Sequence, residues 1–149
     1  MYRQDQKKMK FPFIVIGIGL IILDQISKWW VEFHYPFFIV QNNGIIWGLG
    51  EHWPQYLIIL IYLICLIILF FFLWQFLKTK IIWGQLGCVI ILAGGLSNLI
   101  SRITQGYIID FIKLGFWPAF NCADILIIGG AILYGYSFLR DFQRKSHTP

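Results

Sequence analysis

Two aspartates in the C-terminal half of the chain have neighbours that are unusual for a carboxylate. Asp110 lies between Ile109 and Phe111 in the apolar stretch 107–112, and Asp124 comes directly before another apolar run. Two carboxylates a few ångströms apart in a poorly hydrated site cannot both ionise, so such a pair shares a proton. The ionised member can take a proton from water while the other protonates a carbonyl oxygen or a leaving amine. The pair is therefore a candidate for metal-independent hydrolysis, if the fold brings the two together.

Other catalytic arrangements find less support in the sequence. His34, His52 and His147 are scattered and match no zinc-binding spacing. Ser27 and Ser101 have no histidine nearby in the sequence that could act as a base. We therefore expect neither a metal ion nor another cofactor in the site.

The composition is that of a membrane protein. Residues of the AVILMFWYC set make up 58% of the 149 residues, charged residues make up 13%, and the mean hydropathy is +0.70. A soluble domain carries about 25% charged residues, so the composition excludes an ordinary soluble enzyme. The formal charge of +5 comes from basic residues at the ends of apolar runs. Such residues set membrane topology, and we expect no nucleic-acid partner.

Four apolar runs are long enough to cross a bilayer, which takes about 20 mostly apolar residues. They cover residues 11–31, 56–77, 81–100 and 123–139. The link between the second and third runs, residues 78–80, is short enough to force an antiparallel hairpin. The segments 34–55 and 101–122 are rich in Gly, Asn, Pro and aromatic residues, which favours ordered connections with some extended structure. The prediction is one all-α membrane domain over residues 1–149, with four transmembrane helices and small extended elements in the outer segments.

The basic residues predict the orientation of this domain. With four crossings, nine of the twelve lysines and arginines lie on the side of the N-terminus, so both termini are predicted to be cytoplasmic. Nearly all of the unexpected polar residues then fall in the outer half. An ionisable group near the bilayer centre costs about 2.5–3.5 kcal/mol, so such groups usually face a protein interior or a wet cavity. A cluster at one depth predicts a site, formed by Asp24, Gln25, Ser27, Lys28, Asn42, Asn43, Asn98, Ser101, Arg102, Asp110, Asn121 and Asp124.

Several of these residues also have a purely structural explanation. Asp24 and Lys28 are four residues apart on a helix, so they can neutralise each other. Asn121 and Asp124 fit a helix N-cap and an acid in the first turn. Arg102, near the end of the third helix, can bind a lipid phosphate at the interface. The sequence alone leaves these alternatives open.

Five elements, taken together, resemble the motifs of bacterial lipoprotein signal peptidases, also called signal peptidase II. The resemblance spans about residues 14–139 and is specific because the five occur in the family's order. Residues 24–28 are similar to D-Q-x-S-K, 42–47 to N-x-G-A-A-F, 98–102 to N-x-x-D-R, 106–111 to G-x-V-x-D-F, and 120–124 to F-N-x-A-D.

The resemblance implies an aspartic endopeptidase in which Asp110 and Asp124 are the catalytic pair. The implied substrate is a prolipoprotein, cut before a cysteine that carries a diacylglyceryl group, and membrane phospholipid is the other implied partner. The implied location is the bacterial cell (inner) membrane, as a multi-pass protein whose site faces the outer, periplasmic side. The implied supporting and substrate-binding residues are Asp24, Lys28, Asn42, Asn98, Arg102 and Asn121.

The sequence departs from the family pattern at three places. Ser101 stands where the family has an aspartate beside Arg102, so the expected charge partner of this arginine is missing. Ser97 replaces a glycine, and the bulkier Ile45, Ile46 and Trp47 replace two alanines and a phenylalanine. These side chains are expected to reshape the substrate groove.

Two other functions are compatible with a small polar membrane protein. A transporter or channel subunit needs polar residues through the whole bilayer, and the inner halves of the predicted helices offer little beyond Gln75 and Gln85. A non-catalytic lipid-binding or assembly factor is the stronger alternative, with the aspartates acting as helix caps.

Overall fold

The structure, a computed structural model, describes residues 2–45, 49–77 and 81–146. Within these ranges the chain forms four α-helices: α1 (Tyr2–His34), α2 (Gln55–Leu77), α3 (Ile82–Gln105) and α4 (Cys122–Ser146). Each is long and apolar enough to cross a membrane, over Pro12–His34, Gln55–Phe72, Ile82–Gln105 and Cys122–Arg144. The predicted all-α fold with four transmembrane helices is confirmed. The predicted hairpin link at residues 78–80 lies outside the described residues, as do Ile46 and Trp47.

The helices extend beyond most of the predicted ends. Hydropathy marks the apolar part of a helix, whereas backbone hydrogen bonding continues into the polar turns on either side. Helix α3, predicted to end at residue 100, runs on to Gln105 and stops at Gly106. This glycine has a left-handed φ of 83°, and its N–H donates to the carbonyl of Arg102 at 3.1 Å. Glycine adopts this conformation without steric cost, which ends the helix and turns the chain toward the next strand.

Helix α3 is the centre of the bundle and packs against α4, α1 and α2. Its closest approach is to α4, where glycines face each other. A Cβ added at Gly130 would lie 2.7 Å from the carbonyl oxygen of Gly87, and one added at Gly94 would lie 2.5 Å from that of Ala123. Such small residues let two membrane helices pack backbone to backbone. The arrangement fixes the start of α4 against the outer half of α3.

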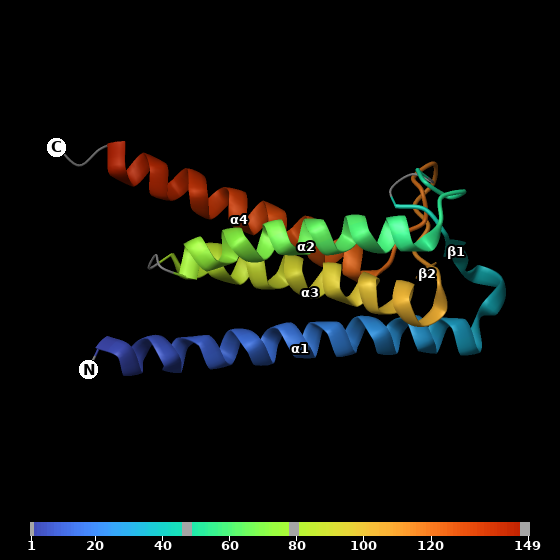
Figure 1. Cartoon of the computed structure of the whole chain (residues 1–149), viewed down its shortest axis with the longest axis horizontal. Helices are drawn as coiled ribbons and strands as arrows, with labels where there is room; N and C mark the ends of the chain where they lie inside the picture. Colours follow the sequence, from blue (N-terminus) through green and yellow to red (C-terminus); the bar gives the residue numbers. More distant parts are fainter. Residues whose placement is uncertain (1, 46–48, 78–80, 147–149) are drawn as a thin grey trace.

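A small sheet lies at the opposite end of the bundle from the first turn of α1 and the last turn of α4 (Figure 1). After a 3₁₀ turn at Pro36–Phe38, strand β1 (Val40–Asn42) pairs antiparallel with β2 (Ile108–Asp110), Val40 opposite Asp110 and Asn42 opposite Ile108. The predicted extended elements are thus confirmed. The sheet joins the segment after α1 to the segment after α3, and so carries two of the predicted site residues to one place.

Candidate active site

Asp110 is the last residue of β2 and is almost fully buried, with 2% of its surface exposed. The side-chain amide of Asn42, on the neighbouring strand, donates to its Oδ2 at 2.9 Å. The amide of Asn121 donates to its Oδ1 at 2.7 Å. Asn121 comes close because the chain reverses after β2, with Ile112 bridged to Phe120. Each oxygen of this carboxylate therefore accepts a neutral amide donor.

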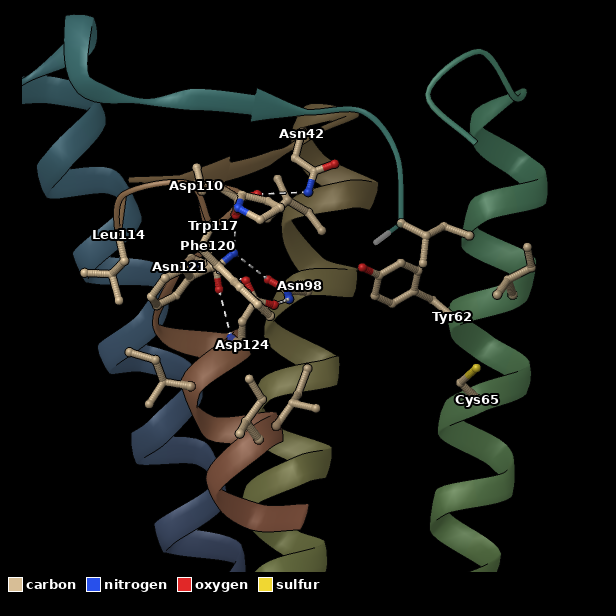
Figure 2. Close-up of a pocket in the computed structure, with 18 residues that line it drawn as sticks. Asn42, Tyr62, Cys65, Asn98, Asp110, Leu114, Trp117, Phe120, Asn121 and Asp124 are labelled. Atoms are coloured by element: carbon tan, nitrogen blue, oxygen red, sulfur yellow. Dashed lines mark hydrogen bonds between the residues drawn. The ribbon is translucent and has the colours of Figure 1, made fainter. Parts of the chain in front are cut away.

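Asp124 lies in the first turn of α4 and shares Asn121 with Asp110. Its Oδ2 accepts the backbone N–H of Asn121 at 3.0 Å, and its own N–H donates to Oδ1 of Asn121 at 3.1 Å. Asn98 of α3 donates to its Oδ1 at 3.0 Å. The reciprocal pair is a helix cap, so that structural explanation is correct. The same Asn121 also holds Asp110, so the cap brings both carboxylates to one cavity, with Asn121 between them (Figure 2).

The environment changes the acidity of Asp110. The pKa of the Asp110 carboxyl is raised to about 6, mainly by burial and in part by the neighbouring Asp124 carboxylate, while the amide donors of Asn42 and Asn121 and the ammonium of Lys28 oppose the rise. A charged carboxylate loses hydration when it is buried, and a second negative charge nearby makes ionisation harder still. Asp110 is therefore able to carry a proton near neutral pH.

Asp24 and Lys28 of α1 do more than neutralise each other. They form an ion pair of 2.7 Å, and both are buried. Lys28 Nζ also donates to Oδ1 of Asn98 at 2.7 Å, and Asp24 accepts the N–H of Ala123 at 2.8 Å. The pair thus ties α1 to the residue that holds Asp124 and to the first turn of α4.

Arg102 is buried, with 1% of its surface exposed, so the lipid-phosphate explanation is wrong. Its guanidinium donates to the backbone carbonyl of Asn42 at 3.0 Å and to that of Gly44. A guanidinium presents a planar fork of donors, which suits two carbonyls on one turn of chain. Arg102 therefore fastens the end of β1, and with it the side chain of Asn42, to α3. The observed partners of this guanidinium are backbone carbonyls, whereas the Ser101 side chain faces Gln25 of α1.

The two serines that depart from the family motifs are linked to the other polar residues of the site through Gln25 and Asp24. Ser97 Oγ donates to Asp24 at 2.7 Å, and Gln25 Nε2 contacts Ser97 Oγ at 2.8 Å and Ser101 Oγ at 3.1 Å. The sequence predicts Gln25 and Ser101 as members of the polar cluster, and Ser97 only as a residue that reshapes the substrate groove. The sequence does not indicate the bond from Ser97 to Asp24, because these residues lie 73 residues apart in the chain and meet only when α1 packs on α3.

A cavity of about 510 Å³ opens beside the carboxylates. The polar groups Asn42, Asn98, Asp110, Asn121 and Asp124 form one wall. The rest of the lining is largely apolar, from α2 on the facing side, from α4 below and from the loop before Asn121 (Figure 2). Among the described residues no group of three or more His, Cys, Asp or Glu side chains is arranged to hold a metal ion.

The structure connects all eight site residues named from the sequence into one hydrogen-bonded cluster beside this cavity: Asp24, Lys28, Asn42, Asn98, Arg102, Asp110, Asn121 and Asp124. Fold and site together define a multi-pass membrane protein with a buried carboxylate, Asp110, and a partly buried one, Asp124, at one end of its helical bundle.

Residues 16–140 match the family described as Signal peptidase (SPase) II. The chain belongs to this family, and it is a membrane peptidase.

Named relatives and solved structures agree with this assignment. The chain is 35% identical to the lipoprotein signal peptidase of Syntrophomonas wolfei, over 87% of this chain and 93% of that protein. It is 32% identical to the lipoprotein signal peptidase of Clostridioides difficile, over 80% of this chain and 89% of that protein. A bacterial membrane enzyme solved by the in meso method at 2.3 Å resolution superposes with a TM-score of 0.70 and 25% identity, over 93% of each chain. A second bacterial membrane enzyme, solved by the same method at 1.9 Å resolution, superposes with a TM-score of 0.67 and 27% identity, over 87% of this chain and 94% of that chain.

Proposed function

We propose that the chain is an aspartic endopeptidase that removes signal peptides from prolipoproteins, with Asp110 and Asp124 as its catalytic pair. Signal peptide removal is the function of the family to which it belongs. The observation that carries the aspartic assignment is the Asn121 side chain and backbone, which bond to both carboxylates at 2.7 and 3.0 Å and hold them at the same cavity wall.

The reaction follows from the shared proton. The ionised carboxylate takes a proton from water, and the water oxygen bonds to the carbonyl carbon of the scissile peptide. The protonated carboxyl gives its proton to the carbonyl oxygen, which forms a neutral tetrahedral diol. The diol then collapses: the C–N bond breaks, one carboxyl protonates the leaving amine, and the other regains the diol proton. One water is consumed, and the two carboxyls return to their starting state.

The cavity lining supports a lipid-modified substrate. Apart from the polar wall, it is formed largely by Ile, Leu, Phe and other apolar side chains, including Ile61, Ile125 and Ile128 within membrane-spanning helices. A diacylglyceryl group keeps its substrate in the bilayer, and burial of its chains against such a surface is favourable. We propose that the bond cut lies just before the diacylglyceryl-modified cysteine. We further propose that the site faces the outer side of the bacterial inner membrane, next to membrane phospholipid.

The test is cleavage of a diacylglyceryl-modified prolipoprotein by the purified protein in detergent, with a chelator present. The wild type is expected to cleave it, and Asp110→Asn and Asp124→Asn are each expected to lose cleavage while retaining their fold. Glu51→Gln is the matched control, because this exposed loop carboxylate lies outside the site, and it should cleave normally. Cleavage by either aspartate variant would refute the assignment of the pair.

The alternative of a non-catalytic lipid-binding factor rests on the observed cap between Asn121 and Asp124. If capping were the whole role of Asp124, its replacement by alanine would cost about 1 kcal/mol of stability. The same protein would then bind the prolipoprotein without cutting it. A folded wild type that binds but does not cleave would favour this function.

A further inference from the structure

Helix α2 contributes a phenol to the cavity wall that faces the two carboxylates. Tyr62 is half-buried and lines the cavity, and Figure 2 shows its hydroxyl pointing from α2 toward Asn98 and Asp124. The neighbouring α2 residues in the lining are Ile61 and Cys65. A substrate peptide that enters between α2 and the carboxylates would therefore meet Asp110 and Asp124 on one side and the Tyr62 hydroxyl on the other.

The amide groups around the carboxylates are already directed at them. Asn42 and Asn121 donate to Asp110, and Asn98 donates to Asp124. The guanidinium of Arg102 donates to two backbone carbonyls. These groups set the geometry of the pair, and a substrate carbonyl opposite the pair needs a donor from another wall.

The charged group near Tyr62 leaves the phenolic proton available. The Tyr62 hydroxyl is close enough to the Arg102 guanidinium to feel its positive charge, while Arg102 donates its hydrogen bonds to the carbonyls of Asn42 and Gly44. Arginine has donors and no acceptor, so it cannot accept the phenolic proton, which can be given to another group. A nearby positive charge also polarises the hydroxyl and makes it a stronger donor.

We propose that Tyr62 is a further catalytic residue, which donates a hydrogen bond to the carbonyl oxygen of the scissile peptide as the carbon becomes tetrahedral. The inference rests on the proposed function. The proton of Tyr62 stays on the phenol throughout. The hydrogen bond stabilises negative charge that develops on the oxygen before the carboxyl protonates it, which is the role of an oxyanion donor.

The test is Tyr62→Phe, which removes the hydroxyl and keeps the ring. Loss of one oxyanion donor costs about 100-fold in kcat, so kcat is expected to fall by about that factor with little change in KM or in the unfolding temperature. The matched control is Tyr56→Phe on the same helix, an exposed tyrosine outside the cavity lining, which should keep the wild-type kcat.

A binding measurement separates the transition state from the ground state. Tyr62→Phe is expected to lose affinity for a peptide whose scissile bond is replaced by a hydroxyl-bearing tetrahedral mimic, and to keep its affinity for an uncleavable N-methyl peptide of the same sequence. A wild-type kcat in Tyr62→Phe, or a change confined to KM, would overturn the Tyr62 proposal. If Asp110→Asn is inactive in the same assay, the proposed function stands regardless. If the wild type does not cleave or Asp110→Asn does, both proposals fail.

Discussion

The two buried aspartates of the site, Asp24 and Asp110, are held in different ways. Asp24 is ion-paired with Lys28 and also accepts a serine hydroxyl and a backbone N–H. Asp110 accepts two neutral amides, and a buried carboxylate with neutral partners is easier to protonate than one with a cation in contact. The first arrangement suits an anchor between helices. The second suits a group that gains and loses a proton in each cycle.

This difference predicts the pH dependence of cleavage. Because burial raises the pKa of Asp110 to about 6, the protonated form is present below that pH and is lost as the pH rises through it. The pair then carries two negative charges and has no proton to give. We expect kcat/KM for the free enzyme to fall across an apparent pKa near 6 that belongs to the pair. The falling part of the kcat profile should lie at higher pH, because bound substrate removes further water.

Asn42→Ala gives the check on this prediction. The amide of Asn42 lowers the pKa of Asp110, so its removal should move the falling part of the kcat/KM profile to higher pH. The measurement is a set of initial rates between about pH 4 and 9, because this range covers the titration of carboxyl groups with a raised pKa. A kcat/KM profile that does not move, or that moves to lower pH, would contradict the assignment of its falling part to the titration of Asp110.

Arg102→Lys tests the anchor of β1. Lysine keeps the charge but offers one nitrogen, so it cannot satisfy the carbonyls of Asn42 and Gly44 in the same fork-like geometry. A buried acceptor left without a donor costs about 1–3 kcal/mol. We expect a loss of that size in unfolding free energy, with reduced cleavage as Asn42 loses its place. The control is the exposed Arg140→Lys on α4; equal stability of the two variants would contradict the anchor.

At the residue level, the sequence predicts which residues belong to the candidate site but not which hydrogen bonds they form. The eight residues stand in motifs whose types and spacing are legible in the chain. That Asn121 bonds to both carboxylates depends on the reversal between Ile112 and Phe120, which no spacing rule specifies. Tyr62 carried no signal of its own, because a tyrosine in an apolar helix looks like any lipid-facing aromatic. Its place at the cavity follows from how α2 packs on α3.

At the level of elements, two adjacent glycines of α4 give a matched pair. A Cβ at Gly130 would meet the backbone oxygen of Gly87 at 2.7 Å, whereas a Cβ at Gly129 has nothing within 4 Å. Gly130→Ala is expected to force α3 and α4 apart, to lose about 1–3 kcal/mol of stability and to lower cleavage. Gly129→Ala should be neutral or stabilising by up to about 1 kcal/mol. Unfolding in detergent measures both, and similar behaviour of the two would refute the close packing.

Elements were predictable where one local property defines them. The four helices follow from apolar length alone, but their ends do not, because polar turns continue the helix outside the apolar part, as at Gln105. Strands β1 and β2 are three residues each and pair residues nearly seventy apart in the chain, as Val40 and Asp110. So short a strand has too few side chains to show a pattern, and its partner is chosen by the packing of α1 and α3.

At the scale of the whole molecule, the site and the chain ends lie at opposite ends of the bundle (Figure 1). The basic residues near both ends favour that side as cytoplasmic. The carboxylates would then work at the outer surface, where the cleavage site of a membrane-anchored precursor emerges. The proposed function therefore requires this orientation, since a site facing the cytoplasm could not reach such a substrate.

Single cysteines test this orientation. Phe116, 98% exposed in the loop before α4, and the exposed Gln143 near the end of α4 mark the two sides. In spheroplasts, a membrane-impermeant maleimide should label Phe116→Cys at once and Gln143→Cys only after the membrane is permeabilised. The background replaces Cys65, Cys88 and Cys122 and must still cleave substrate. The reverse labelling pattern would place the carboxylates on the cytoplasmic side and contradict an enzyme that acts on exported precursors.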